Sequence, residues 1–135
     1  MPDPSPTSDR MLILVVESEP AVRAVAVEAL EDEGFEVIET STADHAATIL
    51  QHRDDIRVVF TDVAMPGDLN GFDLARLAGT LYPEIAVIVV SGALPSGFSG
   101  VAPDAHFLPK PYRMTRVIGL IRRLTAEQAC PAQGG

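Results

Sequence analysis

Uninterrupted apolar runs alternate with segments of helical spacing along most of the chain. Residues 11–16 (MLILVV) are rich in β-branched side chains, which is typical of a strand buried on both faces of a parallel sheet. Residues 35–40 alternate apolar and charged side chains and predict a less buried, edge-like strand. Three further runs, at 58–61, 86–90 and 105–108, bring the predicted strands to five.

Helices are predicted between these strands, because apolar residues recur three and four positions apart. The first begins at Pro20, a residue that suits the first helical position, and ends before Gly34. The others cover residues 41–51, 71–82 and 113–124. Residues 92–104 contain three glycines and two prolines, so a helix there is expected to be short or disordered.

Strands that alternate with helices favour a parallel sheet with right-handed crossovers. We therefore predict an α/β fold: a doubly wound, three-layer sandwich around a five-stranded parallel sheet. One domain spans residues 11–124, and residues 1–10 and 125–135 are expected to be flexible flanking segments. In such a fold, function is located at the carboxyl ends of the strands.

Composition narrows the classes of protein. The 135 residues are 47% hydrophobic and carry a net charge of −9, which argues against a nucleic-acid partner or an anionic membrane surface. A single cysteine, Cys130, excludes an internal disulfide. No apolar stretch approaches the roughly 20 residues of a membrane span, and a cytoplasmic location is expected.

Polar residues follow the predicted strands at the positions where their carboxyl ends should meet. The first strand leads into Glu17, and the third into Asp62. Ser91 follows the fourth strand, and Lys110 stands between two prolines after the fifth. A carboxylate can be a nucleophile toward phosphorus, carboxylates hold Mg²⁺, and a lysine binds phosphoryl oxygens. Phosphoryl chemistry is therefore indicated.

Four motifs occur in order along the chain: VVESEP, FTDVAMPGDLNG, VVSG and FLPKP. Together they resemble the receiver domain of two-component response regulators. The resemblance implies a (βα)₅, flavodoxin-like fold. It implies that the protein is a signalling domain and not an enzyme. It also implies a phosphoryl group accepted from a histidine kinase or phosphotransferase, with Mg²⁺ as cofactor.

By position, the resemblance assigns roles to single residues. Asp62 matches the phosphoacceptor, Ser91 the switch hydroxyl and Lys110 the phosphate-binding lysine. Glu17 and the carbonyl of Ala64 match metal ligands, together with Asp62. The Lys110–Pro111 peptide is expected to be cis, as in the family.

Two positions depart from the family pattern. Ser18 stands where a receiver normally has an aspartate that binds Mg²⁺, so metal affinity should be weakened. Glu19 could compensate by turning inward, but capping of the first helix is the preferred role for its charge. Phe107 occupies the position of the switch aromatic residue, often tyrosine, and lacks a hydroxyl.

Charge is divided unevenly along the chain. Residues 105–124 contain five bases and no acid, so the rest of the chain has a net charge of −14. Arg113 and Arg116 on the last predicted helix form a candidate partner face, although a simple solvated helix face is the preferred explanation.

The leading hypothesis is a stand-alone receiver that signals by binding an unknown downstream protein. The alternative is a degenerate receiver, motivated by Ser18, that binds partners without phosphorylation or binds Mg²⁺ weakly. A phosphohydrolase with an aspartate nucleophile fits poorly, because haloacid-dehalogenase-like enzymes carry a second aspartate where Ala64 stands.

Overall fold

The computed structural model describes residues 11–63, 67, 69–92 and 105–129. Strands and helices alternate along this part of the chain, as the hydrophobic pattern predicts. The elements in chain order are β1 (Leu12–Val16), α2 (Pro20–Asp32), β2 (Glu36–Thr40), α3 (Ala43–His52), β3 (Ile56–Asp62), α4 (Gly71–Leu81), β4 (Ala86–Ser91), β5 (His106–Pro109) and α6 (Met114–Ala129).

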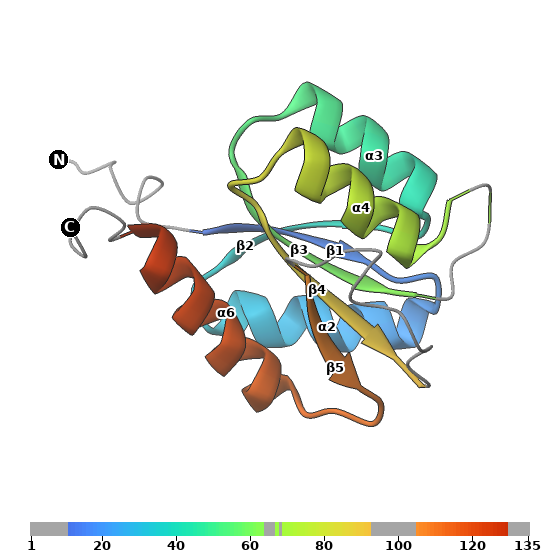
Figure 1. Cartoon of the computed structure of the whole chain (residues 1–135). Helices are drawn as coiled ribbons and strands as arrows, with labels where there is room; N and C mark the ends of the chain where they lie inside the picture. The colour runs from blue at the N-terminus through green and yellow to red at the C-terminus, as the bar shows by residue number, and fades with distance from the viewer. Residues whose placement is uncertain (1–10, 64–66, 68, 93–104, 130–135) are drawn as a thin grey trace, which may run out of the picture.

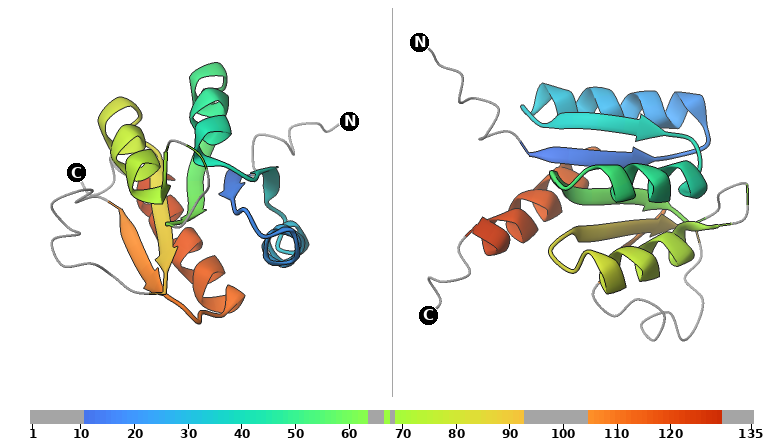
Figure 2. Two further views of the ribbon diagram at one scale, coloured as in Figure 1. Left: turned by 90° about the vertical axis from the view of Figure 1, so that its right-hand side faces the viewer. Right: turned by 90° about the horizontal axis from the view of Figure 1, so that it is seen from above.

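All five strands belong to one parallel sheet of order β2-β1-β3-β4-β5, with β2 and β5 at its edges. Helices α3 and α4 cover one face of the sheet, and α2 and α6 cover the other (Figures 1 and 2). The predicted three-layer α/β sandwich of flavodoxin-like topology is confirmed, including the edge position of the second strand.

The strands divide their side chains between two cores because successive residues of a strand point to opposite faces. On β1, Leu14 packs into the core shared with α3 and α4, whereas Ile13 packs into the core shared with α2 and α6. Val89 and Ile88 of β4 divide in the same way. Burial on both faces explains why the central strands read as continuous apolar runs.

Helix α2 turns part of its apolar surface outward, which the spacing of its residues does not reveal. Ala26 and Leu30 are buried, whereas Val22 and Val25 are 41% and 60% exposed. Apolar residues at helical spacing cover more of the α2 circumference than the sheet can bury. The result is an exposed apolar strip on α2.

The last helix is longer than predicted. We expected a flexible segment from Thr125, but α6 continues to Ala129. Thr125 is 7% exposed, and its hydroxyl donates to the Ile121 carbonyl at 2.7 Å. A threonine can satisfy its hydroxyl within a helix in this way, so a polar composition did not end the helix.

The segment at 93–104, where a short or disordered helix is expected, lies outside the described residues. Residues 1–10 and 130–135, which belong to the flanking segments expected to be flexible, also lie outside the described residues. Across the described ranges, none of the helices combines the length and hydropathy needed to span a bilayer.

Candidate functional site

The parallel sheet brings four of the predicted site residues together at the carboxyl ends of its strands. Glu17 follows β1, Asp62 ends β3, Ser91 ends β4, and Lys110 follows β5. Glu17, Asp62 and Ser91 are only 5% to 7% exposed, although all three are polar. We call this group the strand-end crevice. Buried polar groups at the carboxyl end of a doubly wound sheet mark a functional site.

Asp62 and Lys110 form the closest contact in the crevice. The Lys110 ammonium nitrogen Nζ donates to Asp62 Oδ2 at 2.6 Å. The Lys110 backbone is held as well, because its N–H donates to the Ser91 carbonyl at 2.9 Å. The Lys110–Pro111 peptide is cis, which confirms the expectation from the sequence. Lysine and aspartate are therefore paired across 48 residues of sequence.

Glu17 approaches Asp62 from the other side. Burial raises the pKa of Glu17, and contact with the neighbouring Asp62 carboxyl raises it further. Opposing these effects, a backbone hydrogen bond from Glu19 and the charge of Lys110 lower the pKa. Burial also raises the pKa of Tyr112 in the same crevice, and the charges of Glu17 and Asp62 raise it further.

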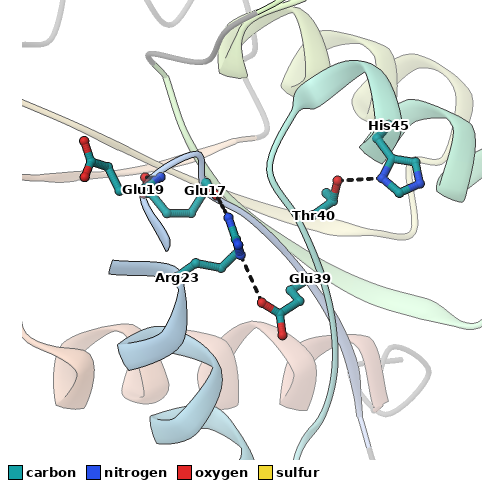
Figure 3. Close-up of polar contacts among 6 residues, drawn as sticks. All are labelled: Glu17, Glu19, Arg23, Glu39, Thr40 and His45. Atoms are coloured by element: carbon teal, nitrogen blue, oxygen red, sulfur yellow. Dashed lines mark hydrogen bonds and ion pairs between the residues drawn. The ribbon is translucent and has the colours of Figure 1, made fainter. Parts of the chain in front are cut away.

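The turn after β1 does not place Glu19 as the sequence predicts. Glu19 is the residue that precedes α2, but its side chain makes no capping hydrogen bond and is exposed. Instead, the Glu19 N–H donates to Glu17 Oε2 at 2.9 Å. The Glu19 carboxylate points away from Glu17 and Arg23 (Figure 3). Glu19 therefore neither caps the helix with its side chain nor turns inward.

The crevice fits a small divalent cation by the chemistry of its donors. Glu17 and Asp62 offer hard carboxylate oxygens, and their mutual repulsion would be relieved by a cation between them. Mg²⁺ commonly takes one or two carboxylates and keeps several waters. Ser18 adds no carboxylate. Within the described ranges, no cluster of three or more histidine, cysteine, aspartate or glutamate residues could hold a metal.

Helix α4 begins directly against the Asp62 backbone. The Gly71 N–H donates to the Val63 carbonyl at 3.0 Å, and a Cβ at Gly71 would overlap the Asp62 carbonyl oxygen. Asn70 and Asp73 cap the start of the helix with reciprocal hydrogen bonds. Gly71 thus permits the start of α4 to lie directly against the Asp62 backbone. Ala64, the predicted carbonyl ligand, lies outside the described residues.

The aromatic ring of Phe107 lies on β5 and is partly buried. It meets the ring of Phe72 on α4 edge to face, with centroids 5.8 Å apart. Because α4 begins beside Asp62, this contact connects the edge strand to the helix next to the crevice.

Arg113 and Arg116 lie outside the crevice. Both are exposed and line a groove of about 770 Å³ between β5 and α6, together with Phe107 and Leu120. Neither arginine forms an ion pair with another side chain in the part of the chain that the structure describes. The candidate partner face is therefore a basic groove rather than a set of internally paired charges.

One residue of the site was missed from the sequence. Arg23 of α2 donates through Nη1 to the Glu17 carbonyl at 2.8 Å and through Nε to Glu39 Oε1 at 3.0 Å (Figure 3). Its signal in the sequence is a lone base on a helix otherwise made of apolar and acidic residues. Identifying its partners required the pairing of β1 with β2, which sequence spacing does not show.

Curated proteins are similar in sequence to most of this chain. The chain is 32% identical over 120 residues to sensor kinase CckA of Brucella abortus, covering 86% of this chain and 13% of that protein. It is 36% identical over 120 residues to the transcriptional regulator NtrC of Rhizobium meliloti, covering 85% and 24%. The chain therefore spans a quarter or less of these relatives.

Solved structures share the fold. A receiver domain protein from Methanospirillum hungatei superposes with a TM-score of 0.85 at 24% identity, covering 92% of this chain and all of that chain. TrrA from Thermotoga maritima, in complex with Mg(2+)-BeF, gives a TM-score of 0.74 at 21% identity, covering 84% and 98%. The family model for the response regulator receiver domain matches residues 13–122. The chain therefore belongs to the response regulator receiver family, whose members are modules of two-component signalling.

Proposed function

We propose that this receiver accepts a phosphoryl group on Asp62 with the help of Mg²⁺ and signals by binding another protein. The observation that supports the proposal most strongly is the contact between Lys110 Nζ and Asp62 Oδ2, 2.6 Å apart in a buried crevice. The contact places the carboxylate beside a cation suited to phosphoryl oxygens.

The donor is a phosphohistidine of a histidine kinase or phosphotransferase, in keeping with the family. A carboxylate oxygen of Asp62 attacks phosphorus in line, so that an O–P bond forms as the N–P bond breaks. The bonding electrons return to the imidazole nitrogen of the donor. Lys110 then holds negative charge on the transferred group, since its ammonium already lies at the nucleophile.

Mg²⁺, when bound, neutralises charge on the phosphoryl oxygens. Glu17 and Asp62 would hold it in the crevice, and the Ala64 carbonyl is the third ligand that the family pattern implies. Because Ser18 supplies no carboxylate, we propose that affinity for the metal is weakened relative to a receiver with an aspartate there.

Ser91 and Phe107 are the proposed switch residues. Ser91 is buried at the end of β4, one strand away from Asp62, and Phe107 packs against α4. A phosphoryl group on Asp62 would attract the Ser91 hydroxyl and shift the population of β5 conformers. The groove lined by Arg113 and Arg116 lies on that strand and is the proposed docking site for the downstream protein.

Incubation with a small acyl-phosphate donor and Mg²⁺ tests phosphorylation directly. We expect an alkali-labile phosphoadduct in the intact protein and none in the Asp62→Asn variant, measured by mass spectrometry. An adduct that persists in Asp62→Asn, or no adduct in the unchanged protein, would contradict the proposal.

A second candidate function is a receiver that acts as an interaction module without phosphorylation. Ser18 favours it, because it removes one of the carboxylates that a receiver uses for metal. A Mg²⁺ titration followed by NMR separates the two candidates. Shifts around Glu17 and Asp62 support phosphorylation, whereas unchanged spectra up to tens of millimolar Mg²⁺ support the interaction module.

A further inference from the structure

Arg23 connects α2, the end of β1 and β2 on the side of the strand-end crevice where Glu17 lies. It lies in the second turn of α2, and its backbone N–H donates to the Glu19 carbonyl at 2.9 Å. Its guanidinium reaches back to the end of β1 and across to Glu39 on β2 (Figure 3). The Arg23 side chain is 21% exposed and that of Glu39 is 50% exposed. A half-exposed ion pair contributes little to stability by itself.

Glu17 is the residue that these contacts hold. Its N–H donates to the Thr40 carbonyl at 3.0 Å, and its carbonyl accepts from Arg23 at 2.8 Å. Its carboxylate Oε2 accepts from the Glu19 N–H at 2.9 Å. The backbone on both sides of the Glu17 Cα is therefore fixed, and its carboxylate is held toward Asp62, which contributes to its raised pKa.

An arginine suits this position better than a lysine. Nε and Nη1 of one planar guanidinium donate in different directions, to Glu39 and to the Glu17 carbonyl. A lysine has the same charge but no fixed fork, so it could not hold both acceptors in this geometry. Glu39 in turn fixes the guanidinium from the neighbouring strand.

We propose that Arg23 is a positioning residue for divalent-cation binding: by fixing the Glu17 backbone against β2, it aims the Glu17 carboxylate at Asp62. The inference rests on the proposed function, because it concerns the same Mg²⁺ site. With Ser18 in place of a carboxylate, Glu17 is the acidic side chain that the β1–α2 turn contributes to the crevice. Its placement therefore has more influence on the metal than it would beside a second carboxylate.

Positioning and simple charge predict opposite results. Removal of a positive charge close to the crevice should by itself favour a cation and tighten Mg²⁺ binding. Loss of positioning should weaken binding instead. In Arg23→Gln we expect the Mg²⁺ dissociation constant to rise about tenfold, the scale of one charge-assisted hydrogen bond. Arg23→Lys keeps the charge and should also weaken binding, by a smaller factor.

The experiment is a Mg²⁺ titration by NMR of the unchanged chain, Arg23→Gln, Arg23→Lys and a control, Arg53→Gln. Arg53 forms an ion pair with Asp55 at 2.7 Å before β3, at the opposite end of the sheet. The control should leave the Mg²⁺ affinity unchanged. Equal or tighter binding in Arg23→Gln would overturn the proposal. So would a tenfold loss that persists in a Glu17→Gln background, because Arg23 is proposed to act through Glu17.

A second readout needs no metal and separates this inference from the proposed function. The Glu19 amide donates to the Glu17 carboxylate, so its hydrogen exchange reports the placement of that carboxylate. Exchange should accelerate about tenfold in Arg23→Gln and stay unchanged in Arg53→Gln. Unchanged Glu19 exchange in Arg23→Gln would overturn the inference even if the protein binds Mg²⁺. If the unchanged chain binds no Mg²⁺ but Glu19 exchange accelerates, the proposed function and the role in cation binding fail together, and only the positioning of Glu17 by Arg23 stands.

Discussion

The two sides of the strand-end crevice are built differently. On the β3 and β5 side, Lys110 contacts Asp62 directly, and the lysine is anchored by the Ser91 carbonyl. On the β1 side, the turn presents Glu17 and Ser18, and the placement of Glu17 depends on backbone hydrogen bonds and on Arg23. The first side is suited to a phosphoryl group and the second to a cation.

Under the proposed function, the two sides of the crevice carry separate tasks. The residues proposed to handle phosphate match the family pattern, whereas the residues proposed to hold metal depart from it at Ser18. Each side can therefore be tested with variants that leave the other side unchanged. The experiments below move from the largest expected effect to the smallest.

Replacement of Lys110 tests the phosphate side. Lys110→Ala removes the ammonium from Asp62, and we expect phosphorylation by a small acyl-phosphate donor to slow about 10²- to 10³-fold, as for loss of one transition-state charge contact. The matched control is Arg57→Ala, which removes one exposed positive charge near the start of β3. A similar slowing in both variants would show that overall charge, and not the Lys110 contact, sets the rate.

Gly71 tests the close approach of α4 to Asp62. In Gly71→Ala the new Cβ overlaps the Asp62 carbonyl oxygen, and we expect the free energy of unfolding to fall by about 1–3 kcal/mol. Gly79→Ala in the same helix meets no atom within 4 Å and should instead stabilise by up to about 1 kcal/mol. Urea denaturation of both variants measures these changes. Equal effects would contradict the steric explanation.

Ser18→Asp tests the metal side by restoring a carboxylate. We expect its Mg²⁺ dissociation constant to fall about tenfold, the scale of a charge-assisted contact. The contribution of Lys110 to the phosphorylation rate should change little. Ser18→Asn, of similar size but without charge, should not tighten binding. Isothermal calorimetry gives both constants, and equal affinities in the three proteins would show that Ser18 does not limit metal binding.

Glu17→Gln tests how far the buried charge of Glu17 destabilises the folded chain. Because the pKa of Glu17 is raised in the folded chain, ionising it opposes folding, and that cost is fully present above the folded pKa. The variant should therefore melt a few degrees higher than the unchanged chain at pH 7 without Mg²⁺. The difference should vanish as the pH falls below the ordinary value of 4.5, where the carboxyl is protonated in both states. A gain independent of pH would contradict this origin.

The sequence predicted the fold well because burial on both faces leaves a continuous apolar run in each central strand. It predicted less well where tertiary contacts decide the outcome. Val22 and Val25 follow helical spacing but are exposed, whereas Ala26 and Leu30 of the same helix are buried. Thr125 appeared to belong to a flexible end, but its hydroxyl bonds within α6.

The site residues, too, could be predicted where the sheet alone places them, and less well where tertiary contacts decide. Glu17, Asp62, Ser91 and Lys110 could be predicted to converge, because the ends of parallel strands share one edge of a sheet. The predicted capping role of Glu19 was wrong, since the direction of its side chain depends on the local backbone path: Glu19 stands at the start of α2 but makes no side-chain capping hydrogen bond. Arg23 was missed because its two acceptors are far apart in the sequence: Glu17 follows β1 and Glu39 lies on β2.

The most direct measurement is the rate of phosphoadduct formation at Asp62 as a function of Mg²⁺ concentration, with a chelator as the zero point. If the phosphate side is intact and the metal side weakened, the adduct maps to Asp62 and its rate rises with Mg²⁺. Half-saturation then lies at a higher concentration than in Ser18→Asp. A rate that is the same in the chelator, or no adduct at any Mg²⁺ concentration, would contradict the central claim.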